Sequence, residues 1–186
     1  MTFAKNALAA LLALAALAPL PAWARSAWTI DPARTHIRFT IDATGWPRTL
    51  GEFHKFDGRI SVDFDHPEQS RVDFTVRSGS VDVGSSAFSA YVAGVAFLNA
   101  EKFADIAFKS TSVAKLNDHQ VRVSGELTLL GVTQALDVDV EVKQGAGKLE
   151  FTAHTHIDRL GFGMNSGYPV ISRQVDLDIT SAAGVS

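Results

Sequence analysis

The sequence predicts an all-β protein built as an extended, eight-stranded antiparallel barrel with one short helix. Apolar and polar residues alternate with a period of two from Ala27 onwards, as in strands with one buried and one solvated face. Short turn sequences separate these stretches, and connections this short require antiparallel neighbours. The chain has 186 residues, of which 46% are hydrophobic, so it has the size and composition of one globular domain.

Residues 1–24 have the three regions of a secretory signal peptide. Lys5 is followed by an apolar run, then by prolines and the triplet Ala22-Trp23-Ala24. The apolar run is shorter than the ~20 residues that a membrane-spanning helix needs. We therefore expect cleavage after Ala24, a single domain over residues 25–186, and a protein exported to the periplasm. The sequence has no Asn-x-Ser/Thr acceptor that would favour a glycosylated secreted protein.

Eight stretches with strand periodicity follow. They are residues 37–41, 60–64, 72–76, 106–108, 121–129, 136–142, 149–157 and 175–179. Turn residues between them include Asn117-Asp118 and Gly131. Gly51 and Gly58 flank a Phe-rich stretch and predict bulges or close backbone approach.

One segment breaks the alternation. Within residues 85–98 the apolar side chains recur at spacings of three and four, which predicts one short helix capped by Ser85 or Ser86.

The length of the strands favours a barrel with a usable interior. The stretches 132–143 and 148–158 would each be roughly 30 to 40 Å long. Eight such strands, closed into a barrel, leave room for packed side chains or one small ligand. The chain has 12 Phe but only 2 Tyr and 3 Trp, so this interior should be apolar. An elongated apolar molecule would suit it.

Composition excludes several function classes. The net charge is −3 and no segment concentrates Lys or Arg, so nucleic acid is not an expected partner. The absence of Cys excludes thiolate catalysis and Cys-ligated metals. His154, His156 and Asp158 share one strand face and could bind zinc, but this face is expected to be the solvated one.

A hydrolase is poorly supported by the sequence. No Gly-x-Ser-x-Gly motif surrounds the loop serines, Ser85, Ser86 and Ser166. We expect no catalytic and no metal-binding residues. A secreted metal-dependent or serine hydrolase, and a stress-related structural module that binds nothing, remain the alternatives.

Five ordered motifs span residues 28–164. They are Trp28-x-Ile30-Asp31-Pro32, Gly51-x-Phe53-x-x-Phe56-x-Gly58-x-Ile60, Phe97-Leu98 with Glu101-Lys102-Phe103 and Ile106-x-Phe108, Gly125-x-Leu127-Thr128-Leu129-x-Gly131-Val132-Thr133, and Arg159-x-x-Phe162-Gly163-Met164. Together they resemble the YceI family of bacterial periplasmic proteins. The resemblance implies a lipocalin-like barrel that carries a polyisoprenoid, such as an isoprenoid quinone or a polyprenyl phosphate, without needing a cofactor.

The expected ligand-binding residues are mostly inward-facing aromatic and aliphatic side chains. They are Phe39, Ile41, Phe53, Phe56, Phe74, Phe88, Tyr91, Phe97, Phe108, Leu129, Phe151, Arg159, Phe162 and Met164. Arg159 has two interpretations: a surface ion pair with Asp158 or a neighbouring residue, or a guanidinium that meets a ligand head group at a barrel end.

The head group is expected to be neutral. Where the family carries charged residues, residues 88–94 of this chain are uncharged, and a buried anion needs charged donors. We therefore expect a ubiquinone-like ligand, with Arg159 and Arg34 as the two cations that could change this preference by pointing inward. A membrane redox or lipid-handling protein is a further expected partner, and the oligomeric state, monomer or homodimer, is left open.

Overall fold

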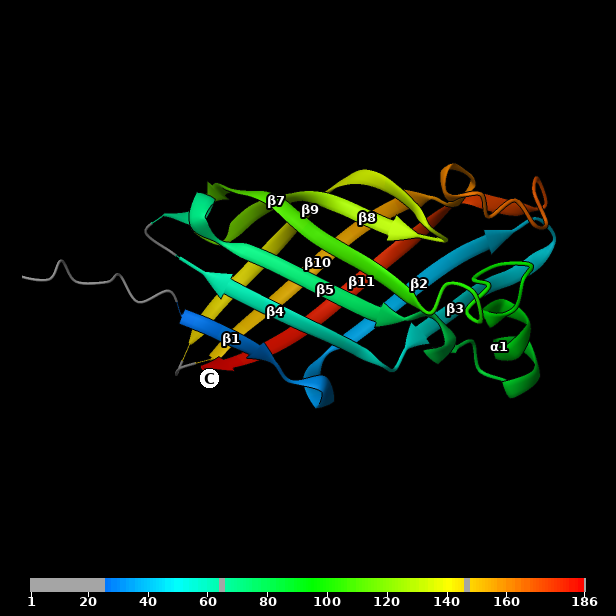
Figure 1. Cartoon of the computed structure of the whole chain (residues 1–186), viewed down its shortest axis with the longest axis horizontal. Coiled ribbons are helices and arrows are strands. Elements are labelled where there is room, and N and C mark those ends of the chain that lie inside the picture. Colours follow the sequence, from blue (N-terminus) through cyan, green and yellow to red (C-terminus); the bar gives the residue numbers. More distant parts are fainter. Residues whose placement is uncertain (1–25, 64–65, 146–147, 186) are drawn as a thin grey trace, which may run out of the picture.

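Eleven strands form one antiparallel sheet that curls round on itself (Figure 1). This computed structural model describes residues 26–63, 66–145 and 148–185. The sheet order is β1-β4-β5-β7-β8-β9-β10-β11-β2-β3-β6, and β1 pairs with both β4 and β11. These two pairings join β1, β4, β5 and β7 to β11 into a ring, as the barrel prediction requires, while β2, β3 and β6 extend the sheet from β11. The predicted signal peptide, residues 1–24, lies outside the described residues.

The five C-terminal strands, β7 to β11, are the longest. Their bounds are β1 Ser26–Ile30, β2 His36–Ala43, β3 Trp46–Phe53, β4 Phe56–Val62, β5 Arg71–Arg77, β6 Val81–Asp82, β7 Asp105–Asn117, β8 Gln120–Leu129, β9 Val132–Gly145, β10 Lys148–Asp158 and β11 Ile171–Val185. With 14 residues, β9 extends about 45 Å along its own axis.

The predicted count of eight strands is wrong, because β1, β3 and β6 were not expected. Each of them belongs to an interrupted strand path. The 3-10 turn η1, Pro32–Arg34, separates β1 from β2, and Pro32 has no N–H to continue a ladder. Residues 54–55 separate β3 from β4, and η3, Ser78–Ser80, separates β5 from β6. Eight continuous paths thus become eleven strands.

The single helix is confirmed, although it is shorter than residues 85–98. Helix α1 spans Ser86–Ala93, and the Ser85 hydroxyl accepts a hydrogen bond from the Phe88 N–H at 3.3 Å. Gly94 ends the helix, and the following residues fold into tight turns held by backbone bonds such as Leu98 N–H to the Val92 carbonyl, 3.1 Å. Among the described residues, no helix is long and apolar enough to cross a bilayer.

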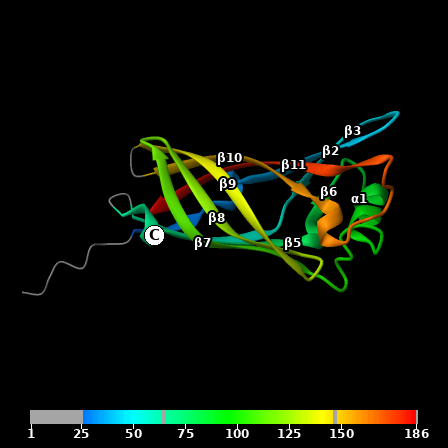
Figure 2. The ribbon, with the colours of Figure 1, turned by 90° about the horizontal axis from the view of Figure 1, so that it is seen from above.

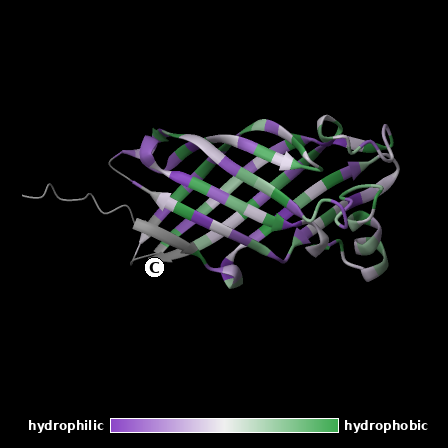
Figure 3. Cartoon of the chain, in the orientation of Figure 1, coloured by the Kyte–Doolittle hydropathy of each residue, from purple (hydrophilic) through white to green (hydrophobic). Residues whose placement is uncertain are grey.

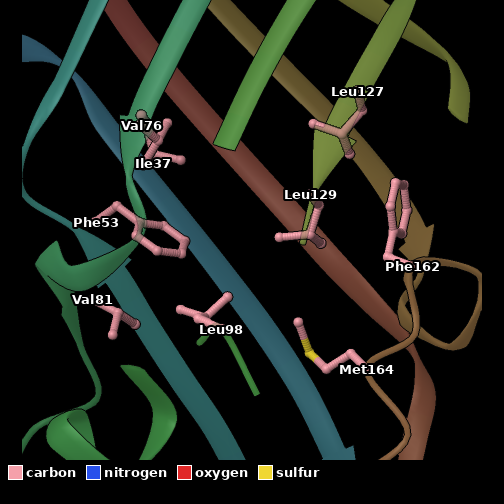
Figure 4. Packing of buried hydrophobic residues seen from close by; sticks show 9 residues of the cluster. All are labelled: Ile37, Phe53, Val76, Val81, Leu98, Leu127, Leu129, Phe162 and Met164. Carbon is pink, nitrogen blue, oxygen red and sulfur yellow. The ribbon is translucent and has the colours of Figure 1, made fainter. Parts of the chain in front are cut away.

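The alternation of the sequence becomes two distinct faces of the sheet. Hydrophobic and hydrophilic residues succeed one another along every long strand (Figure 3). The main apolar cluster gathers near α1 and includes Phe53, Leu98, Leu129, Phe162 and Met164 (Figure 4).

The two ends of the barrel carry different segments. Helix α1 and the turn η4, Arg159–Phe162, lie at one end, together with the β2–β3 turn, while the last strand ends at the other (Figures 1 and 2). We call the first the α1 end. The second, which includes the β7–β8 turn at residues 117–120, is the opposite end.

Candidate ligand-binding cavity

A cavity of about 720 Å³ occupies the interior of the barrel. Its lining runs from Phe88 and Met164 at the α1 end to His119 at the opposite end, so it extends along the barrel. Most of the lining is aliphatic or aromatic. This volume falls within the range of small-molecule sites, and side chains therefore do not fill the barrel completely.

Alternating strand positions build this lining. On β8, Val121, Val123, Leu127 and Leu129 all point into the cavity, while Arg122 and Glu126 are exposed. The same period of two gives each long strand one apolar inner face.

Glycines on this inner face make room for phenylalanine rings. A Cβ atom at Gly51 would lie 2.2 Å from the ring of Phe39, and one at Gly58 would lie 2.7 Å from the ring of Phe74. These glycines allow close approach, as the sequence suggested. No register shift occurs at either of them, so the alternative expectation of a bulge is wrong.

Twelve of the fourteen predicted ligand-binding residues line the cavity. They are Phe39, Ile41, Phe53, Phe74, Phe88, Tyr91, Phe97, Phe108, Leu129, Phe151, Arg159 and Met164. Phe56 and Phe162 are not among the lining residues. Phe56 instead stacks on Phe74, with ring centroids 5.7 Å apart, and Phe162 is buried in the apolar cluster.

Aromatic side chains of helix α1 and of the turns that follow it form one wall of the cavity at the α1 end. The ring of Tyr91 stacks on Phe88 at 6.4 Å and meets Phe97 edge-on at 5.5 Å. Phe88 and Tyr91 line the cavity and yet are exposed to solvent. The cavity therefore reaches the surface beside α1.

Arg159 is completely buried and lines the cavity. Its guanidinium donates hydrogen bonds to four backbone carbonyls, including those of Ser172 at 2.7 Å and Ile171 at 2.9 Å. Burial lowers the pKa of Arg159. The interpretation of Arg159 as a surface ion pair with Asp158 or a neighbour is therefore wrong, because the side chain is buried among backbone carbonyls and Asp158 pairs with Arg173.

The same four bonds determine what Arg159 can offer a ligand. A guanidinium carries five N–H donors, and backbone carbonyls accept four of them here. At most one donor is left for a ligand. Arg34, the other candidate cation, has a side chain 39% exposed and lies 3.8 Å from Glu150, so it does not serve the cavity.

Sequence reasoning missed the polar lining at the opposite end. Lys115, Asp118, His119 and Gln120 line the cavity there. The Lys115 ammonium lies 2.7 Å from the Asp118 carboxylate. Their position in a short turn was evident from the sequence, but their contact with the cavity depends on the curl of the sheet.

The candidate metal ligands lie on the outer face, as expected. His154 and His156 are exposed, and His154 pairs with Asp178 on β11. Within residues 26–63, 66–145 and 148–185, no three His, Asp or Glu side chains are placed to hold a metal ion.

Comparison with known proteins places the chain in a family. The profile of the YceI-like domain matches residues 28–183. The chain belongs to the YceI family. A UPF0312 protein of Shewanella putrefaciens is 32% identical over 183 residues, which cover 94% of this chain and 95% of the relative. A UPF0312 protein of Ectopseudomonas mendocina is 36% identical over 132 residues, covering 70% of this chain and 69% of that one.

Solved structures share the fold of this YceI-family chain. Burkholderia cenocepacia BcnA superposes with a TM-score of 0.78 at 23% identity, covering 82% of this chain and 98% of BcnA. A polyisoprenoid binding domain from Saccharophagus degradans gives a TM-score of 0.72 at 15% identity, covering 87% of this chain and 99% of that domain. At these identities the likeness concerns the fold alone.

Proposed function

We propose that this YceI-family protein is a periplasmic carrier that binds an isoprenoid lipid in the barrel cavity. The observation that carries the proposal is the length and apolar lining of the 720 Å³ cavity. Burial of apolar surface contributes ~25 cal/mol per Å², so a long polyprenyl tail supplies ample binding energy. A related fold serves as a polyisoprenoid binding domain in Saccharophagus degradans, which supports the same ligand class here.

The ligand's head group is neutral in this proposal, as in a quinone. The single donor that Arg159 can still offer matches one carbonyl oxygen. A diphosphate would bring several anionic oxygens into the cavity, each needing a donor. The protein acts by binding and release, requires no cofactor, and catalyses no reaction.

Extraction of the purified protein tests this function. An organic-solvent extract, analysed by mass spectrometry, should contain an isoprenoid lipid in near-stoichiometric amount. Protein refolded from denaturant should take up added ubiquinone. If the native protein carries no isoprenoid and the refolded protein binds none, the carrier function is wrong, and a non-binding module replaces it.

A further inference from the structure

Large apolar side chains are exposed at the α1 end of the barrel. Six of them come from three segments: the β2–β3 turn, the α1 segment (residues 86–103) and the loop before β11. Trp46 is 74% exposed and Val95 is 83% exposed. These six, which we call the mouth residues, are Trp46, Phe88, Tyr91, Val95, Tyr168 and Val170. Leu50 on β3 and Val132 at the start of β9 are also exposed and are not counted among them.

These three segments meet around the end of the cavity. The Thr44 N–H donates to the Val170 carbonyl at 2.8 Å, which fixes the β2–β3 turn to the loop. Gly167 of that loop lines the cavity together with Phe88 and Tyr91 of α1. Phe88 and Tyr91 thus lie where the cavity reaches the surface, and the other mouth residues belong to the same or to adjoining segments of the α1 end.

The opposite end of the barrel is different in kind. Its exposed lining residues include Lys115, Asp118 and His119. Leu116 is the one large exposed hydrophobic residue recorded there among the described residues, at 45% exposure. Among the described residues, the large exposed hydrophobic side chains are thus more numerous at the α1 end, which is the end that an apolar partner would contact.

Two arginines at this end are paired with carboxylates, while the Lys102 ammonium lies 5.1 Å from the centroid of the Phe103 ring. Arg48 lies 2.7 Å from Asp42 beside the β2–β3 turn, and Arg173 pairs with Asp158 beside η4. Each of these arginines is already neutralised by a carboxylate.

The aromatic content points to a lipid surface. Both tyrosines of the chain, Tyr91 and Tyr168, are mouth residues, and Trp46 is a third amphipathic ring. Tyr and Trp are the side chains enriched at the boundary between bilayer and water.

We propose that the mouth residues dock the α1 end on the surface of a phospholipid bilayer. Docking is driven by apolar insertion, so it does not need anionic lipids. In that position the cavity opens towards the membrane, and a lipid can move between them without crossing water. This route for the cargo rests on the proposed carrier function, whereas docking itself does not.

Flotation with phosphatidylcholine vesicles that contain no isoprenoid lipid tests the proposal. Every sample has the same N-terminus, established by mass spectrometry, so that only the substitutions differ. The parent protein should float with the vesicles equally at low and high salt. A Trp46→Ser/Tyr168→Ser variant, and separately Tyr91→Ser, should reduce the bound fraction by about tenfold or more. Leu116→Ser, at an exposed apolar site of the opposite end, should leave it unchanged.

The outcomes separate docking from the carrier function. Docking is wrong if the parent protein does not float, if salt abolishes flotation, or if Leu116→Ser weakens it as much as the mouth variants. A protein partner would then be the better occupant of this end. Flotation by a protein that binds no isoprenoid would support docking and overturn the carrier function. Uptake of ubiquinone by a protein that does not float would support the carrier function and overturn docking.

Discussion

The ring of Phe39 lies over the backbone of Gly51, its partner across β2 and β3. A Cβ atom at residue 51 would come within 2.2 Å of that ring, closer than any real contact. The same relationship joins Phe74 to Gly58, its partner across β4 and β5. The ring of Phe108 also lies over a glycine, Gly125, which sits diagonally across β7 and β8 rather than opposite it. Each of the three rings therefore occupies space on the inner face that a side chain at the glycine would fill.

Gly51→Ala should destabilise the protein by about 1–3 kcal/mol, because the Phe39 ring must leave its position. Phe39→Leu removes the ring and should restore much of this loss when combined with Gly51→Ala. Chemical unfolding of the single and double variants measures the coupling. Gly145→Ala is the control, since nothing lies within 4 Å of its added Cβ. Strictly additive effects would contradict the contact.

Arg159→Met should destabilise the protein by about 3–5 kcal/mol. Four backbone carbonyls would lose their hydrogen-bond donor. The hydrogen bonds from Arg159 to these carbonyls hold the loop that leads into β11. Arg173→Met removes an exposed ion pair with Asp158 and should cost far less, because solvent screens exposed pairs. Urea unfolding compares the two. Similar losses would show that the bonds made by Arg159 add little.

The ionised Glu52 side chain should raise the free energy of unfolding at neutral pH and lose this effect in acid. Burial raises the pKa of Glu52, but hydrogen bonds from His36 and Arg38 outweigh this effect and hold it below its ordinary value. A carboxylate with a lowered pKa stabilises the fold at pH above about 4.3, and its contribution is lost as pH falls through the folded-state pKa.

The test compares the parent protein with Glu52→Gln over pH 3 to 7. The difference in unfolding free energy should be largest near neutral pH and shrink in acid. Glu101→Gln, at an exposed turn position, controls for the loss of one charge. A difference that grows as the pH falls would mean that the sign is wrong.

Much of the fold followed from side-chain alternation, because β7 to β11 are long and keep one apolar face. Strand β3 was missed because Pro47 and Gly51 disturb its pattern, and β6 because two residues carry no period. Most of the cavity lining could also be predicted from this alternation, because the apolar face of each strand is the face that lines the cavity. The environment of Arg159 did not, since its four acceptors are backbone carbonyls, whose positions no side-chain pattern records.

Phe88→Asp and Tyr91→Asp should lower lipid retention more than thermal stability. Helix α1 contains no buried residue, so its substitution leaves the core largely intact. Both rings line the cavity, where a carboxylate would meet an apolar tail. Retention is measured by extraction and melting by calorimetry. Equal losses of retention and stability would show that the segment is only part of the core.

Competition between two ligands of equal tail length tests the head-group preference. Ubiquinone should displace a polyprenyl diphosphate from the refolded protein, because the tails contribute equally and only the head groups differ. A quinone carbonyl needs one hydrogen bond, worth about 0.5 to 1.5 kcal/mol, and Arg159 retains one donor for it. A diphosphate must surrender its hydration and finds too few donors in the cavity beside α1.

The opposite end of the cavity offers the diphosphate its only comparable site, at Lys115 among the residues described. That ammonium already contacts Asp118, and the pKa of this carboxyl is lowered by the hydrogen bond from Lys115. An anion there would meet a competing carboxylate. Lys115→Gln should therefore leave the ranking of the two ligands unchanged. Tighter binding of the diphosphate, lost in Lys115→Gln, would place the head group at the opposite end and reverse the orientation of the ligand.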